Sequence, residues 1–176
     1  MEALSLRLAP IEPADEKAFL EVTRRSRRLH RPWVYPPTTT AEFRAFLEGV
    51  GPARQRLLLW AGDPDAGEGL AGYFSLGEIV RGPLNSAYLG YWASPDWAGR
   101  GVMSRGMQIL LRHGFRHLRL HRIEANIQPG NLASISLARR CGFRHEGFSP
   151  KYLKVGGRWR DHERWAMTVE DWRAGA

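Results

Sequence analysis

The chain has 176 residues, 43% of them hydrophobic, and we expect a single globular domain over residues 1–176 with a hydrophobic core. Its 26 Lys and Arg outweigh 18 Asp and Glu to give a net charge of +8, so the surface attracts anions. Residues 1–7 lack the pattern of an export leader, and no apolar stretch is long enough to span a membrane. The only cysteine, Cys141, cannot form an internal disulfide. The composition therefore excludes a disulfide-stapled or transmembrane protein and favours the cytoplasm.

The first half of the chain predicts helices followed by strands. A short strand is expected at residues 5–8 and helices at 15–30 and 41–50, the second capped by Thr39 or Thr40. Residues 31–37 hold two aromatics among three prolines, so we expect a stiff connection that walls a substrate pocket or packs as a loop. Strands at 56–61, 70–80 and 84–93 form a predicted antiparallel meander.

A glycine-containing loop at residues 97–103 lies between the strand at 84–93 and a helix that begins at Val102. Gly99 and Gly101 allow a sharp turn, and the free N–H groups of the following helix face the loop, which favours a pyrophosphate. No lysine follows a glycine, which excludes a nucleotide-triphosphate P-loop, and Ser104 replaces the third glycine of a dinucleotide loop. Alone, the loop could equally be a simple turn.

The second half continues the alternation of helices and strands. The helix that begins at Val102 carries an apolar face to about residue 118, and a strand follows at 122–127. A helix at 131–141 is capped by Asn131 and stopped by Gly142. Two strands at 143–154 and 161–168 are joined by a turn at Gly156 and Gly157.

Positive charge is concentrated in the predicted first helix, at Arg24, Arg25, Arg27, Arg28 and Arg31. Such a cluster suits a contact with the ribosome or with nucleic acid. The alternative, which we favour, is a solvated helix face in a protein from an arginine-rich proteome.

The motif Asn131-x-x-Ser134-x-x-Leu137, ending in Gly142 and Phe143, follows the glycine loop by about thirty residues. Together the two motifs resemble the GCN5-related N-acetyltransferase (GNAT) superfamily. The runs at residues 89–92, 121–126 and 157–162 are similar to the ribosomal-protein alanine N-acetyltransferases of the RimJ/RimL type. The resemblance implies an α+β GNAT fold, in which a mixed, mostly antiparallel sheet of six to seven strands carries about four helices and splays open at the fourth strand.

The resemblance also implies where acetyl-CoA binds. The strand before the loop and the loop itself would offer backbone groups to pantetheine and pyrophosphate, with the Arg100 side chain near a phosphate. Asn131 and Ser134 would reach the pantetheine side. The implied cofactor-binding residues are Tyr91, Trp92, Ala93, Gly99, Arg100, Gly101, Val102, Met103, Ser104, Asn131 and Ser134. For catalysis, the N–H of Ala93 would polarise the thioester and Ser134 would protonate the CoA thiolate.

Some positions depart from the family pattern. Ala98 stands where Gln or Arg is usual, and Arg105 where Glu is common, so we expect phosphate binding to depend on backbone donors. Asn126 and Ala138 replace the Glu and Tyr that serve some members as base and acid. The base is left open among Glu124, Asp161 and His162, and we favour Glu124 and Asp161 as partners of nearby arginines.

The implied reaction moves an acetyl group to a primary amine by direct attack in a ternary complex. The expected acceptor is the N-terminal α-amino group of a protein. Alternatives are a polyamine or aminoglycoside, or a non-catalytic acetyl-CoA-binding module that contacts ribosome or nucleic acid through the basic helix. We expect no metal, although His113, His117 and His121 lie four residues apart, and no acyl intermediate on Cys141. The sequence leaves the oligomeric state open, a homodimer included.

Overall fold

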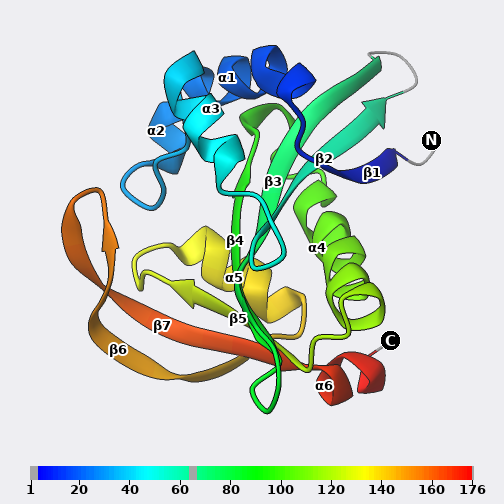
Figure 1. Cartoon of the computed structure of the whole chain (residues 1–176), viewed down its shortest axis with the longest axis vertical. Coiled ribbons are helices and arrows are strands. Elements are labelled where there is room, and N and C mark those ends of the chain that lie inside the picture. The colour runs from blue at the N-terminus through cyan, green and yellow to red at the C-terminus, as the bar shows by residue number, and fades with distance from the viewer. Residues whose placement is uncertain (1–3, 64–66, 176) are drawn as a thin grey trace.

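A seven-stranded sheet with the order β1-β2-β3-β4-β5-β7-β6 organises the chain (Figure 1). The computed structural model describes residues 4–63 and 67–175. Residues 1–3, which belong to the segment expected not to be an export leader, lie outside the described residues. The strands are β1 Ser5–Pro10, β2 Gln55–Asp63, β3 Gly67–Val80, β4 Ser86–Ala93, β5 Arg122–Ile127, β6 Arg144–Val155 and β7 Arg158–Thr168. In the described part of the chain the α-helices are α1 Glu16–Arg25, α2 Arg27–His30, α3 Thr40–Glu48, α4 Val102–Arg112, α5 Leu132–Arg140 and α6 Val169–Ala174. None of these helices has the length and apolar character that crossing a membrane requires.

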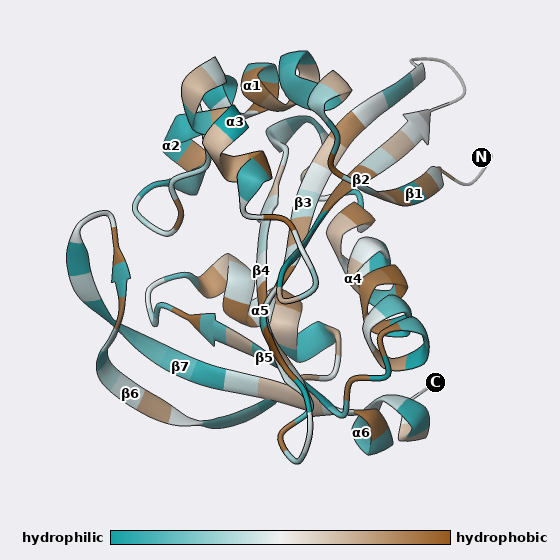
Figure 2. Ribbon diagram, viewed as in Figure 1, coloured by the Kyte–Doolittle hydropathy of each residue, from teal (hydrophilic) through white to brown (hydrophobic). Residues whose placement is uncertain are grey.

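Alternation along the central strands gives the sheet two buried faces. In β2, Leu57 and Leu59 belong to the core cluster beneath α4 and α5, whereas Leu58 belongs to the cluster beneath α1 and α3. Apolar and polar residues alternate along the ribbon of α4, as expected for a helix with one face on a sheet (Figure 2). The two groups of helices therefore cover opposite faces of the sheet.

The predicted helix at residues 15–30 is wrong in one respect, because it breaks at Ser26. This residue has φ −93° and ψ 11°, and its hydroxyl donates to the carbonyl of Val22. Such a serine competes with the helix for backbone partners. The break separates α1 from the single turn of α2 and redirects the chain toward the sheet.

The helix predicted to reach residue 118 also ends early, since α4 stops at Arg112 and a π-helical turn follows at His113–His117. In that turn a Cβ on Gly114 would lie 2.7 Å from Cδ1 of Ile123, so the backbone approaches the sheet closely there. Close packing against β5 accompanies this local widening of the helix.

The sheet opens between β4 and β5, its one parallel pair. These strands pair only from Ser86 to Tyr88 and from Arg122 to Glu124. Every other neighbouring pair is antiparallel. The predicted mixed sheet with an opening at the fourth strand is thereby confirmed. About four helices were expected, and the described residues add the two short helices α2 and α6.

The β6–β7 hairpin curls toward the loop between α2 and α3 (Figure 1). Its turn has positive φ at Gly156 (58°) and Gly157 (80°), as a two-residue hairpin requires. A Cβ on Gly156 would lie 2.6 Å from the Tyr35 ring, so the turn contacts the predicted stiff segment. Strand β7 begins at Arg158, three residues before its predicted start, because Val155 and Arg158 already pair across this turn.

Candidate active site

The glycine loop ends in an uncapped helix N-terminus. Gly99 and Gly101 have φ of 76° and 72°, and Gly101 is the N-cap of α4 without a side-chain capping bond. The first bond of the helix runs from the N–H of Arg105 to the carbonyl of Gly101, at 3.1 Å. The N–H groups of residues 102–104 therefore have no carbonyl partner within the helix. Their exposed donors and the helix dipole suit a phosphate group.

The side chains of this loop offer fewer groups for an anion than its backbone does. The Arg100 guanidinium carbon lies 5.2 Å from the centroid of the Trp97 ring. Arg105 donates through Nη2 to the carbonyl of Leu4 at 2.8 Å, which ties α4 to the start of β1. Ala98 is exposed and offers no polar group. These contacts agree with the expectation that an anion here would be held mainly by amide groups.

The edge of β4 presents peptide groups to the opening of the sheet. Ala93 pairs with Gly72, and the N–H of Ser94 donates to the carbonyl of Ala71 at 2.9 Å. In an antiparallel ladder this pattern turns the N–H and C=O of Ala93 and Tyr91 away from β3. The peptide groups of Trp92 face β3 instead. Of the three predicted β4 residues, Tyr91 and Ala93 thus direct their backbone groups to the region where β5 has diverged.

Ser134 lies opposite β4 and contacts a side chain that the sequence interpretation had used only for its backbone. The Tyr91 hydroxyl lies 2.6 Å from Oγ of Ser134 and donates to the Ser134 carbonyl at 3.2 Å. Burial raises the pKa of Tyr91 to about 12, so the hydroxyl stays protonated near neutral pH. Ser134 therefore has a neutral hydrogen-bond partner that fixes the position of its hydroxyl.

Asn131 caps α5 as predicted. Its Oδ1 accepts from the N–H of Ser134 at 3.2 Å. The amide nitrogen of this side chain remains a donor that can face a ligand. The cap also places Ser134 in the first turn of α5, next to Tyr91.

A buried histidine holds the end of β4, and the sequence interpretation missed it. His30 is 4% exposed, its Nε2 lies 3.0 Å from the carbonyl oxygen of Ala93, and its ring centroid is 5.1 Å from that of Trp92. Since a carbonyl only accepts, Nε2 carries the proton. Burial lowers the pKa of His30, so the ring is neutral near pH 7. The sequence does hint at this burial, because His30 has helical spacing from Phe19, Thr23 and Ser26, which are also buried.

A cavity of about 700 Å³ lies on the face of the sheet covered by α1–α3. Its floor includes Tyr73, Tyr91 and Trp92, and its rim includes Arg27 and Tyr35. Much of the segment at residues 31–37 lines it, which agrees with the pocket-wall interpretation. The cavity reaches β4 at Gly90–Trp92, so it adjoins the strand whose edge faces the opening.

The three candidate bases have other contacts. Glu124 accepts from Arg122 at 2.8 Å, as favoured, whereas Asp161 accepts from the N–H of Lys151 at 2.8 Å rather than from an arginine. His162 is buried, and its Nδ1 donates to the carbonyl of Arg160 at 3.0 Å. None of the three lines the cavity.

Asn126 faces the same side of the sheet as the cavity, because Ile123, Ala125 and Ile127 point to the opposite core. Its Oδ1 is buried and has no hydrogen-bond partner among the residues that the structure describes. An amide oxygen in that condition can accept from a substrate N–H.

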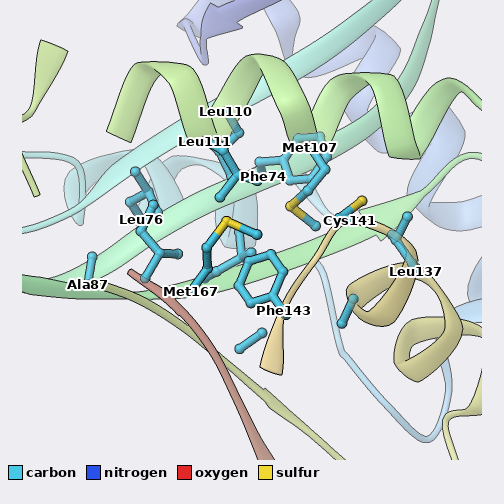
Figure 3. Close-up of a cluster of buried hydrophobic side chains, with 14 of the residues drawn as sticks. Phe74, Leu76, Ala87, Met107, Leu110, Leu111, Leu137, Cys141, Phe143 and Met167 are labelled. Atoms are coloured by element: carbon cyan, nitrogen blue, oxygen red, sulfur yellow. The ribbon is translucent and has the colours of Figure 1, made fainter. Parts of the chain in front are cut away.

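Cys141 belongs to the core, where it lies among Met107, Leu137 and Phe143 (Figure 3). Burial raises the pKa of its thiol, which disfavours the thiolate that a nucleophile requires. This environment supports direct attack over an acyl-cysteine.

The three histidines with helical spacing have different contacts. His113 contacts Gln55 at 2.8 Å and its ring centroid lies 5.7 Å from that of His117, whereas His121 contacts Glu170 at 3.2 Å. Across residues 4–63 and 67–175, no cluster of three His, Cys, Asp or Glu is arranged to hold a metal.

Residues 5–144 match the family described as Acetyltransferase (GNAT) domain. The chain belongs to the GNAT family. It is 39% identical over 113 residues to the ribosomal protein uS5-alanine N-acetyltransferase of Escherichia coli strain K12, a match that covers 64% of this chain and 58% of that relative. The GNAT membership inferred from the two motifs is therefore confirmed, and the matched part spans somewhat more than half the length of this curated relative.

Solved GNAT structures share the fold over nearly the whole chain. RimJ of Mycobacterium smegmatis, in complex with CoA-disulfide, aligns with a TM-score of 0.83 at 27% identity over 94% of this chain and 83% of its own. Spermidine N-acetyltransferase from Vibrio cholerae, in complex with CoA and spermine, aligns with a TM-score of 0.78 over 96% and 98% of the two chains. At 21% identity the second likeness concerns the fold alone.

Proposed function

We propose that this GNAT protein transfers an acetyl group from acetyl-CoA to a primary amine, the N-terminal α-amino group of a protein. The observation that carries the proposal is the early divergence of β4 from β5 beside the uncapped N-terminus of α4. A ribosomal-protein alanine is the proposed acceptor, because the E. coli relative is an alanine N-acetyltransferase of ribosomal protein uS5.

The donor would lie along β4 and end at the glycine loop. Backbone N–H groups from Gly99 to Ser104 would hold the pyrophosphate, with the Arg100 side chain close by. Tyr91 and Ala93 would bond pantetheine through their outward peptide groups, and Asn131 would contribute its amide. Fixed backbone donors of this kind bind phosphate without side-chain charges.

The transfer needs a donor for the developing oxyanion and a proton for the departing thiolate. The amine attacks the thioester carbon, the N–H of Ala93 stabilises the oxyanion, and the C–S bond breaks to release CoA. Ser134 donates its proton to the sulfur and regains one from the water that takes up the proton lost by the amine. Its hydroxyl is positioned by that of Tyr91 at 2.6 Å. His30 bonds the Ala93 carbonyl, which belongs to the next peptide group along the chain, and so fixes the end of β4 beside this N–H.

An α-amine needs little help from a general base to become neutral. With a reference pKa near 7.7–8, about a third of it is neutral near pH 7.4, whereas a lysine side chain is almost wholly charged. The proton lost on attack can therefore leave through cavity water. This supports an N-terminal acceptor over a lysine at a site where the predicted bases are engaged elsewhere.

A cytoplasmic location follows from a ribosomal acceptor, and the free, buried Cys141 fits a reducing compartment. A binding module without turnover would need the same donor site, so only activity separates the two. The contacts of Arg24 with the Thr38 carbonyl and of Arg25 with Asp96 give part of the basic helix a structural role.

The test is a thiol-release assay with acetyl-CoA and N-terminal Ala peptides, lysine peptides, spermidine and an aminoglycoside. We expect the Ala peptides to be acetylated most efficiently, with loss of turnover but retained acetyl-CoA binding in Ser134→Ala. A lack of acetyl-CoA binding in calorimetry would contradict the proposal. Faster turnover of spermidine than of every peptide would favour the small-amine alternative.

A further inference from the structure

The acceptor cavity carries an uneven set of charges. Its charged lining residues are Arg27, Arg31 and Glu42, and its buried His30 is neutral near pH 7. Glu42 is occupied by the cap of α3, because Oε2 accepts from the N–H of Thr38 at 2.7 Å and the N–H of Thr39 at 3.1 Å. These bonds, led by that from Thr38, lower the pKa of Glu42. Its carboxylate is thus already compensated by helix-terminal amides.

The two arginines lie at the rim and are four residues apart, at the start of α2 and just after it. The Arg31 guanidinium carbon is 5.2 Å from the centroid of the Tyr35 ring. The side chain of Arg27 has neither a hydrogen bond nor an ion pair within the part of the chain that the structure describes. Both side chains are exposed, so their charges are accessible to a substrate that enters the cavity.

A third positive charge lies beneath the floor. Arg56 is 9% exposed, and its guanidinium carbon is 3.7 Å from the centroid of the Phe46 ring, which also lines the cavity. Its Nη1 is buried without a hydrogen-bond partner among the described residues. Burial lowers the pKa of Arg56, but an arginine still stays protonated near neutral pH. A charge in such a low-dielectric position acts more strongly than one in water.

We propose that the cavity selects a protein N-terminus followed closely by an acidic side chain, and disfavours polycationic amines. This inference rests on the proposed acetyl transfer and names the acceptor that the same site prefers. The acidic side chain would lie at the rim, against Arg27 and Arg31, while the amine enters toward β4. A volume of about 700 Å³ suits several peptide residues better than a single amino acid.

Polyamines illustrate the opposite case. They carry two or more positive charges, and each one beyond the reacting amine would face the rim arginines. Like charges brought together at a binding surface are strongly disfavoured. The shared fold with spermidine acetyltransferase therefore does not carry over to a shared acceptor.

The experiment compares three peptide amides that begin with Ala and differ only at the next two positions, which are Glu-Glu, Gln-Gln or Lys-Lys. The enzymes are the wild type, the double variant Arg27→Gln/Arg31→Gln, and Arg28→Gln as a matched control. Arg28 lies on the same helix and is exposed but does not line the cavity. Spermidine is the polyamine probe, and kcat/KM is measured by thiol release.

We expect kcat/KM to fall in the order Glu-Glu, Gln-Gln, Lys-Lys, by about fivefold at each step for partly exposed charge pairs. Raising the salt concentration should shrink the differences, since rim charges are screened. The double variant should lose the order, and Arg28→Gln should keep it. Equal use of the Glu-Glu and Lys-Lys peptides by the wild type would overturn the inference, as would an order that survives in the double variant.

Peptide binding in the presence of CoA, measured by calorimetry, separates this inference from the proposed function. Tighter binding of the Glu-Glu peptide that depends on Arg27 and Arg31, without turnover, would contradict acetyl transfer and leave the selectivity standing. Turnover of all three peptides at equal rates would contradict the selectivity and leave the proposed acetyl transfer standing.

Discussion

Replacement of Tyr91 by Phe tests whether a tyrosine on β4 positions the proposed proton donor. The change removes a single hydroxyl that lies 2.6 Å from Oγ and 3.2 Å from the carbonyl of Ser134. Both groups of Ser134 lose a partner in a part-buried site, which costs roughly 2 kcal/mol of folding free energy. For a chain of this size that corresponds to a fall in Tm of about 4–8 °C.

The effect on catalysis should exceed that of a merely structural change. If Ser134 protonates the thiolate, Ser134→Ala should lower kcat by about 100-fold, at the low end for general acid catalysis. Tyr91→Phe leaves the serine in place but mispositioned, and we expect a loss of about tenfold, with KM for acetyl-CoA nearly unchanged. In the Ser134→Ala background the same change should have under about a twofold effect, because the group it positions is gone.

The measurement is a double-mutant cycle on kcat, determined by thiol release from pH 6 to pH 10. Because the pKa of Tyr91 is raised to about 12, the ratio of wild type to Tyr91→Phe should stay constant across this range. Tyr88→Phe is the matched control, since it removes a hydroxyl from the same strand that contacts Tyr152 at 3.3 Å rather than Ser134. Additive losses in the double variant, or an equal loss in Tyr88→Phe, would refute the reasoning.

Three further substitutions test other parts of the site. Gly101→Ala places a residue with a Cβ at φ 72°, where the new atom meets nothing within 4 Å, so we expect a loss of about 1 kcal/mol in folding free energy from backbone strain alone. Calorimetry should show a clear loss of acetyl-CoA affinity, and unchanged affinity would argue against phosphate binding by this loop. Gly106→Val places a Cβ 2.5 Å from Leu59, and thermal unfolding should show a loss of about 1–3 kcal/mol, whereas full stability would contradict this close packing. Burial lowers the pKa of His30 below its unfolded value of 6.5, so its contribution to folding stability is complete above pH 6.5 and is lost as the pH falls below that value. His30→Gln should therefore flatten the decline in Tm between pH 7 and pH 5, and an unaltered slope would argue against a buried, neutral His30.

Much of the fold could be predicted because its determinants are local. Alternating apolar residues marked the strands, and the Gly156–Gly157 turn and the Asn131 cap were found where their chemistry requires them. The break at Ser26 could not be predicted in the same way, because a serine hydroxyl within a helical pattern is compatible with both outcomes. Tertiary packing against the sheet decides between them.

The glycine loop was also predictable, since Gly99 and Gly101 have the positive φ that a sharp turn requires. The contact between Tyr91 and Ser134 spans 43 residues and that between His30 and Ala93 spans 63, so neither leaves a local pattern. Tyr91 was identified for its backbone alone. His30 was overlooked because the arginines around it made that end of the helix look like surface.

Strand β4 connects the proposed donor and acceptor sides of the site, because successive side chains of a strand point to opposite faces of the sheet. Tyr91 turns its side chain toward α5 and Trp92 toward the cavity, while the outward peptide groups of Tyr91 and Ala93 lie between them along the open edge. His30 ends the single turn of α2 that follows the break at Ser26, and from there its imidazole reaches the Ala93 carbonyl. The segment that carries the rim arginines therefore also holds the Ala93 carbonyl, one peptide group beyond the N–H proposed to polarise the thioester. Because His30 of α2 bonds the residue of β4 that bears this N–H, we expect a shift of α2 on acceptor binding to move the end of β4 through this hydrogen bond of 3.0 Å.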